Sequence, residues 1–188
     1  KSIMYAGEGE PLIHKQINEI VAKTKEVGID VSFTTNAVAM NDRFIENSLQ
    51  HTSWVKVSLN GGSAKSYAQV HQTREIDFQR VINNLKKAVE FRNKNKLNCT
   101  IGVQSVLLPE NADEMVNLGK IIRDEIGADY FVIKPFSQEP SSINRLYEDI
   151  DYRSMTLRAN EKRLKALETE NFKVSYRSET MSNYHEDQ

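Results

Sequence analysis

Apolar and polar positions follow two periods along this chain. Short runs rich in β-branched and aromatic residues predict strands, and the segments between them repeat an apolar residue every third or fourth position, as helices do. Five such runs occur in the order "SIMYAG", "DVSFTT", "WVKVSLN", "NCTIGVQSVLL" and "YFVIKPF". A last run, "FKVSYR", predicts a sixth strand or an extension.

The segments between these runs predict amphipathic helices. The first has Pro11 in its opening turn and Gly28 as its C-terminal cap, which are the positions these residue types favour. One face of this helix carries Ile13, Ile17, Ile20, Val21, Thr24 and Val27. Further helices are expected at about Asp42–Gln50, around Val81–Val89, at Asp113–Ile126 and at Ser154–Glu170.

The strict alternation of strand and helix predicts an α/β fold with parallel strands and right-handed crossovers. A closed eight-stranded barrel needs about 250 residues, and the chain has 188. We therefore expect an open, partial (β/α)6 TIM-like barrel, with a core over 1–150 and a helix, a strand and a polar tail over 151–188. The first strand would be an unpaired edge, so we also expect a preceding strand that this sequence lacks.

Composition limits the classes of binding partner that we expect. Charged residues make up 27% and the net charge is −1, which favours a small molecule or a protein over nucleic acid. No apolar run approaches the roughly 18 residues of a membrane span. Cys99 is the only cysteine, which excludes an internal disulfide and favours a reducing, cytoplasmic setting.

Polar residues gather where ligands bind in parallel α/β folds, at the carboxyl ends of the strands. They lie in Gly7–Pro11, at Thr35 and Asn36, in Ser58–Gly62, at Gln104 and Ser105, and at Lys134.

These motifs together resemble the core of a radical S-adenosylmethionine (radical SAM) enzyme. "GEGEP", "TTNA", "VSLNGG" followed by "YAQVH", and "IKP" occur in the order of that family over about Ile3–Pro140. The resemblance implies binding of S-adenosylmethionine and a [4Fe–4S] cluster, and reductive cleavage of the former to a 5′-deoxyadenosyl radical that abstracts hydrogen from a substrate. It also implies an electron donor, and similarity to the maturase-like branch implies a peptide or protein substrate.

The resemblance also implies roles for individual residues. Gly9, Glu10 and Pro11 match the family's Gly-Gly-Glu-Pro loop, which binds the amino group of the methionine moiety, although Glu8 replaces the first glycine. Glycine lets carbonyl groups approach the ammonium, and Glu10 would add a charged hydrogen bond. An exposed turn that caps a helix is the alternative.

The remaining cosubstrate positions implied by the resemblance are Asn36, Ser58, Asn60 and Gln104. Asn36 and Ser58 would reach the ribose or carboxylate, and Gln104 the ribose. His71 stands where many relatives carry an arginine for the carboxylate, and a solvated histidine at a helix end is its alternative. For Gly61 and Gly62 the alternative is turn chemistry alone.

The cluster is a separate expectation. Family members hold it with a Cys-x3-Cys-x2-Cys loop after their first strand, and this sequence has one cysteine. The ligands are therefore expected before residue 1, and the chain alone would not perform the reaction. Neither His14, His51 nor His185 has metal-ligand spacing.

Two other functions remain open from the residues alone. Lys134 on a strand suggests a lyase or aldolase that forms a Schiff base, but the following Pro135 and the lack of a nearby acid–base partner favour a snorkelling or ion-paired lysine. A non-catalytic α/β module that binds a ligand at the strand ends is the third hypothesis.

Overall fold

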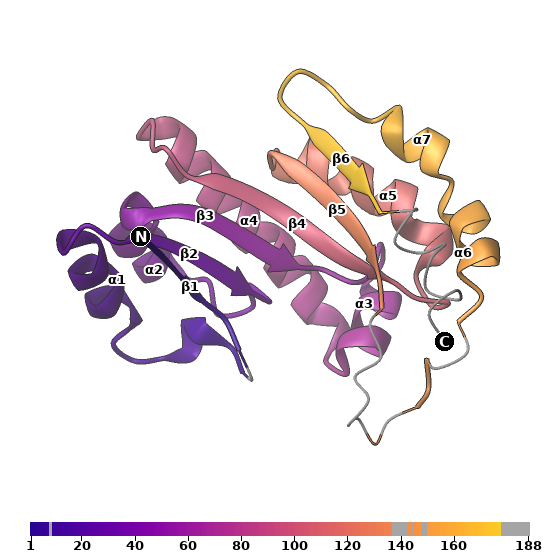
Figure 1. Ribbon diagram of the computed structural model, residues 1–188, viewed down its shortest axis with the longest axis horizontal. Coiled ribbons are helices and arrows are strands. Elements are labelled where there is room, and N and C mark those ends of the chain that lie inside the picture. Colours follow the sequence, from indigo (N-terminus) through magenta and orange to yellow (C-terminus); the bar gives the residue numbers. More distant parts are fainter. Residues whose placement is uncertain (8, 137–142, 144, 148–149, 178–188) are drawn as a thin grey trace.

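A computed structural model describes residues 1–7, 9–136, 143, 145–147 and 150–177. One sheet contains six parallel strands in sequence order (Figure 1). The strands are β1 (Ser2–Tyr5), β2 (Asp30–Thr35), β3 (Thr52–Ser58), β4 (Thr100–Leu107), β5 (Tyr130–Pro135) and β6 (Lys173–Tyr176). Each expected strand is therefore present, including the sixth, and β6 pairs with β5 in the same sheet.

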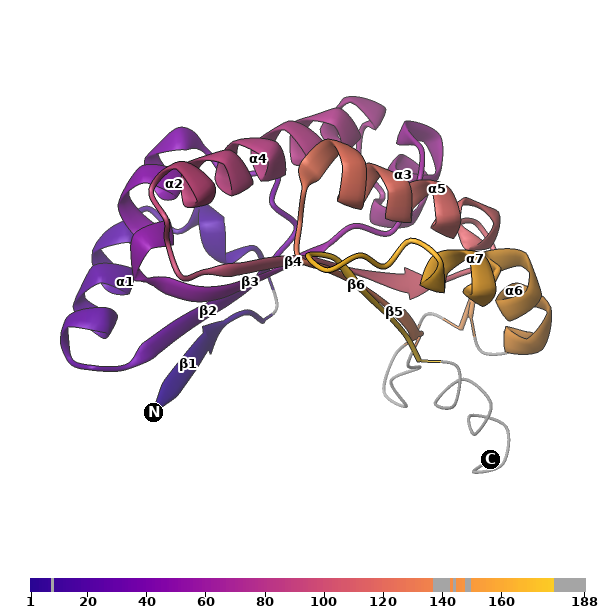
Figure 2. The ribbon, with the colours of Figure 1, turned by 90° about the horizontal axis from the view of Figure 1, so that it is seen from above.

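Helices cover one side of this sheet, and the sheet curves around its other, uncovered side (Figure 2). The α-helices are α1 (Ile17–Glu26), α2 (Asp42–Ser48), α3 (Ala64–His71), α4 (Glu75–Lys94), α5 (Met115–Lys120), α6 (Tyr152–Ala159) and α7 (Glu161–Lys165). Short 3-10 helices lie at Pro11–Ile13, Leu49–His51 and Ala112–Glu114, and a π-helix follows α5 at Ile121–Ile126. The sheet is not closed, which confirms the predicted partial barrel.

Alternation along each strand separates the two faces of the sheet. On β3, Val55 and Val57 are fully buried under the helices, whereas Trp54, Lys56 and Ser58 are partly exposed. The same period places Ser32 and Thr34 of β2, Gln104 of β4 and Lys134 of β5 on the uncovered inner face. The apolar core thus lies between sheet and helices, and the inner face remains available to ligands.

Three helix predictions differ from the structure. Ile13 is 70% exposed, because a 3-10 turn ends there and α1 begins only at Ile17. The single helix expected over Ser154–Glu170 is interrupted at Asn160, whose φ of 55° breaks the helical path and whose side chain caps α7. The helix expected over Asp113–Ile126 changes type along its length.

Among the described residues, no helix combines the length and apolar character that a membrane crossing requires.

Candidate functional site

The loop after β1 is fixed to the end of β2 by Glu10. One carboxylate oxygen, Oε1, accepts hydrogen bonds from the Thr35 hydroxyl at 2.5 Å and from the Leu12 N–H at 3.0 Å. The other, Oε2, accepts from the Asn36 N–H at 2.7 Å. Both oxygens therefore have partners inside the protein, and these contacts hold the loop against the end of β2.

The two glycines of the loop adopt backbone conformations that side chains disfavour. Gly7 has φ 129° and Gly9 has φ 154°, and the Gly9 N–H donates to the Gly7 carbonyl at 2.9 Å. No heavy atom lies within 4 Å of the Cβ position at either glycine. Open space beside a left-handed backbone favours close approach of a ligand to these peptide groups. Pro11 then starts the 3-10 turn with its φ already set.

Asn36 follows directly after β2 and is partly exposed. Its Oδ1 accepts from the Val38 N–H at 2.9 Å, which forms a tight side-chain turn. The amide nitrogen of the same side chain has no hydrogen bond to the described part of the chain. Asn36 thus keeps a donor beside the Glu10 loop.

Asn60 and His71 link β3 to its neighbours. The Asn60 N–H donates to Nε2 of His71 at 3.1 Å, and Asn60 Oδ1 accepts from the Val106 N–H at 2.8 Å. The His71 ring stacks on Tyr67 with centroids 4.3 Å apart. Burial lowers the pKa of His71 to about 4, so the ring is neutral near pH 7 and acts as an acceptor. The solvated histidine considered above is therefore wrong, and a neutral ring offers no charge to a carboxylate.

Ser58 and Gln104 are direct neighbours across β3 and β4. Both are partly exposed on the inner face. Neither side chain has a hydrogen-bond partner within the described ranges. Of the positions implied by the resemblance, these two therefore offer whole polar groups to a ligand.

Close approach explains the two glycines that follow Asn60. A Cβ on Gly61 would lie 2.4 Å from the Tyr67 nitrogen, and one on Gly62 would lie 2.7 Å from the Glu114 carbonyl oxygen. The Gly62 N–H also donates to Glu114 Oε2 at 2.9 Å. Backbone contact, rather than turn chemistry alone, requires glycine here.

Sequence reasoning missed two cations on the inner face, Lys56 and Arg177. Lys56 points across the Trp54 ring, with Nζ 5.4 Å from the ring centroid. Its pKa is lowered, first by burial and then by the positive charges of Lys134 and Arg177. Only strand pairing brings Lys56, Lys134 and Arg177 together. The two nearest in sequence, Lys134 and Arg177, are 43 residues apart.

The protein's own residues do not fit an iron–sulfur cluster. Cys99, the only cysteine, is buried just before β4, at the amino end of the sheet, and burial raises the pKa of its thiol to about 12. A cluster needs thiolate ligands, three in this family. No group of three or more candidate metal ligands occurs within the described residues.

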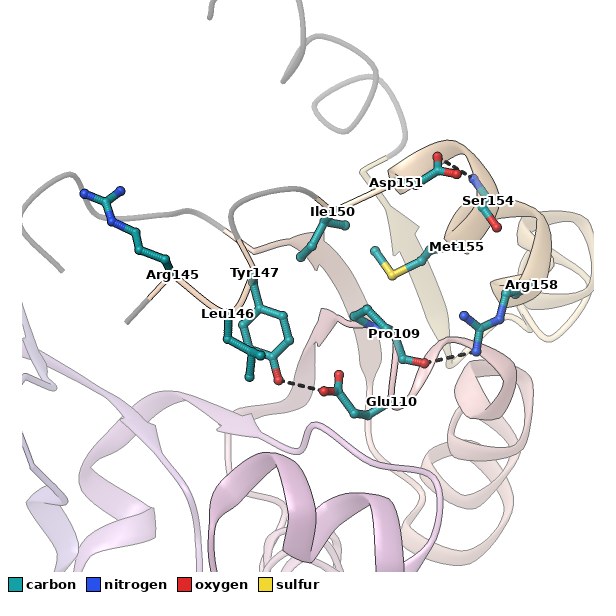
Figure 3. Close-up of a pocket in the computed structure, with 10 residues that line it drawn as sticks. All are labelled: Pro109, Glu110, Arg145, Leu146, Tyr147, Ile150, Asp151, Ser154, Met155 and Arg158. Atoms are coloured by element: carbon teal, nitrogen blue, oxygen red, sulfur yellow. Dashed lines mark hydrogen bonds between the residues drawn. The ribbon is translucent and has the colours of Figure 1, made fainter. Parts of the chain in front are cut away.

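A cavity of about 370 Å³ lies beside the carboxyl end of β4. Figure 3 shows Leu146, Tyr147, Ile150 and Met155 around it. The Tyr147 hydroxyl donates to Glu110 Oε1 at 3.0 Å, and burial with this contact raises the pKa of Tyr147 to about 12. Glu110 Oε2 is buried without a partner in the described part of the chain.

Comparison with protein families gives one match, the Radical SAM superfamily, over residues 1–122. Comparison with curated proteins gives no match. Solved structures of similar fold include Streptococcus suis SuiB bound to S-adenosylmethionine, at 18% identity and a TM-score of 0.67, covering 98% of this chain and 41% of that one.

TYW1 with a lysine–pyruvate adduct bound is 14% identical with a TM-score of 0.66, covering 88% of this chain and 50% of that one. A domain of pyruvate-formate lyase-activating enzyme from Bacteroides vulgatus ATCC 8482 is 8% identical with a TM-score of 0.64, covering 93% and 97% respectively. SuiB has also been solved with its precursor peptide SuiA. These identities show likeness of fold. The chain spans half or less of the length of TYW1 and of SuiB.

Proposed function

The chain belongs to the radical SAM superfamily, and we propose that it binds S-adenosylmethionine along the carboxyl ends of β1 to β4. In the whole enzyme this cosubstrate would undergo the family's reductive cleavage to a 5′-deoxyadenosyl radical, with an electron donor as partner. Since the residues of this chain do not fit the cluster, the cluster ligands would come from outside the present sequence. The lone buried Cys99 accords with a reducing, cytoplasmic setting.

One observation carries the proposal: the Glu10 carboxylate binds the end of β2 instead of facing outward. This leaves the carbonyl groups of Gly7 and Gly9 as the acceptors for the methionine ammonium, since both glycines have open space around them. Glu10 would then act by positioning those carbonyl groups. Its negative charge would still attract the ammonium over a short distance.

The rest of the cosubstrate would extend along the strand ends toward β4. Asn36 offers an amide donor next to the loop, and Ser58 with Gln104 offers adjacent polar groups suited to ribose hydroxyls. Asn60 Oδ1 accepts from Val106 and the Asn60 backbone N–H donates to His71, so we assign Asn60 a positioning role, with its side-chain amide nitrogen left without a partner among the described residues.

The substrate side would be the inner face of β3 to β6. Three spacings of about 4.8 Å make this curved face roughly 14 Å across, which is wide enough for an extended peptide. SuiB, which shares the fold, has been solved with a precursor peptide. We therefore propose a peptide or protein as substrate. Family membership favours a radical SAM enzyme over the Schiff-base lyase and binding-module hypotheses.

The test compares Glu10→Gln and Thr35→Val with Glu26→Gln, a change at an exposed glutamate of α1. S-adenosylmethionine binding is measured by isothermal titration calorimetry. Both loop variants should bind at least about tenfold more weakly, because each removes part of the hydrogen bonding that orients the turn. The α1 variant should bind as the parent protein does. Unchanged binding by Glu10→Gln would refute the role of the loop.

A further inference from the structure

Three cations lie on the uncovered inner face without acidic partners among the described residues. Lys56 is on β3, Lys134 on β5, and Arg177 directly follows β6. The Arg177 N–H donates to the Ile133 carbonyl at 3.1 Å, which places Arg177 beside Lys134. None of the three forms an ion pair in the ranges that the structure describes.

The cations are close enough to affect one another. Lys134 and Arg177 both lower the pKa of Lys56, in addition to its burial. Unpaired like charges at short range cost free energy, and a partly buried position increases that cost. Some cations elsewhere are paired, such as Lys25 with Asp30, Lys87 with Asp42, and Arg158 with Asp113. The inner cluster is therefore suited to an anion supplied from outside.

Trp54 and Tyr130 form an aromatic surface beside Lys56, and Tyr130 precedes Lys134 on the same strand, β5. Their rings stack with centroids 6.3 Å apart, and a Cβ on Gly102 would lie 2.2 Å from the Tyr130 ring. Gly102 thus lets the ring lie flat against β4, next to Lys56 in register. An incoming group meets an apolar surface with Lys56 over it and Lys134 further along β5, which suits a side chain with a hydrocarbon stem and a carboxylate tip.

The cosubstrate's own carboxylate is poorly placed to occupy this cluster. In S-adenosylmethionine the amino and carboxylate groups share one carbon, so both would lie near the Glu10 loop at β1 and β2. Lys134 on β5 is three strands from β2, or about 14 Å at 4.8 Å per strand. Lys56 points toward Trp54, away from the carboxyl end of β3.

The geometry points to a carboxylate-binding site, formed by Lys56, Lys134 and Arg177, that holds an acidic side chain of the peptide substrate. This inference rests on the proposed function for the peptide nature of the substrate. The site would fix the register of the peptide on the inner face. It would also select peptides that carry a glutamate or aspartate near the position that reacts.

The experiment uses the full chain and two dansyl-labelled peptides, Gly-Ala-Glu-Ala-Glu-Ala-Gly and the same sequence with glutamine for glutamate. Fluorescence anisotropy at low salt measures both affinities. The parent protein should bind the acidic peptide at least about tenfold more tightly, equivalent to ~1.4 kcal/mol. Equal affinities, or no saturable acidic-peptide binding below about 1 mM, would overturn the inference.

Two charge-matched triple variants separate the site from general attraction. K56Q/K134Q/R177Q neutralises the inner face, and K65Q/K94Q/K120Q neutralises exposed lysines on the helical side. Each takes the net charge from −1 to −4, because three positive charges are lost. The preference for the acidic peptide should disappear in the first and persist in the second. Equal loss in both would contradict a specific site.

Two further readouts keep the result interpretable. Each inner cation is also neutralised singly, with about a threefold loss expected if two to three ion pairs share the effect. Free glutarate that competes as well as the acidic peptide would contradict a peptide site. S-adenosylmethionine binding is measured in parallel and should be unchanged in the inner triple variant. If the parent protein does not bind S-adenosylmethionine, that result counts against the proposed function and not against the cation site.

Discussion

Lowering the pH should destabilise the protein through His71. The unfolded histidine has a pKa of 6.5, and burial lowers the folded value to about 4. Between these values the unfolded state binds more protons, so the free energy of unfolding falls as pH falls through this window. A pKa difference of that size is worth at most ~3 kcal/mol. Partial exposure of the ring reduces the expected loss to ~2 kcal/mol between pH 7 and about 4.5.

The assay is urea unfolding of the parent protein and His71→Gln at several pH values in this range. Glutamine can still accept from the Asn60 N–H but does not titrate, and the carboxylates that titrate below pH 5 are common to both proteins. The difference in free energy of unfolding should therefore change by ~2 kcal/mol in favour of His71→Gln as pH falls. His51→Gln serves as the control and should run parallel to the parent. If the difference in free energy of unfolding between His71→Gln and the parent protein changes by less than about 0.3 kcal/mol over this pH range, a buried, neutral His71 is refuted.

Three further predictions concern stability, each measured by urea unfolding at pH 7. Gly61→Ala should cost more than ~2 kcal/mol, because the added Cβ meets backbone at 2.4 Å; a cost below about 0.5 kcal/mol would show that α3 does not approach so closely. Tyr147→Phe should lower the free energy of unfolding by ~1–3 kcal/mol, because the Glu110 carboxylate loses its donor. Glu110→Gln should cost less, because glutamine keeps an acceptor and removes a buried charge. A larger cost for Glu110→Gln than for Tyr147→Phe would contradict the contact. Asn160→Ala should cost ~1–2 kcal/mol and Asn160→Gly less, since glycine loses the cap but relieves the left-handed backbone at φ 55°; equal costs would show that the backbone there is unstrained.

Periodicity was sufficient to predict the sheet. Strands buried on one face alternate cleanly, as in β3, and the helices between them carry a stripe that can face only the sheet. It was insufficient at Asn160, because the apolar spacing continues across the break and asparagine is only a weak signal for a left-handed residue. The prediction that Ile13 is buried was wrong for a related reason. Its spacing matches the apolar face of α1, but the 3-10 turn directs its side chain outward.

The candidate site shows where sequence reasoning ends. Motif order located Ser58 and Gln104 on neighbouring strands, but the exact register makes them a pair. The Glu10 carboxylate looked available to a ligand because its partners Thr35 and Asn36 lie 25 and 26 residues away. Contacts over such separations leave no local pattern. Lys56 and Arg177 were missed likewise, because only strand pairing brings them near Lys134.

The most direct test of the central claim is the affinity for S-adenosylmethionine of two matched double variants. Ser58→Ala/Gln104→Ala removes the paired polar groups of the inner face, and Ser53→Ala/Gln79→Ala removes the same groups from exposed positions elsewhere. By calorimetry, the parent protein should bind saturably, the first variant should bind at least about tenfold more weakly, and the second should match the parent. Absence of saturable binding by the parent protein at millimolar S-adenosylmethionine, or equal weakening in both variants, would contradict the account.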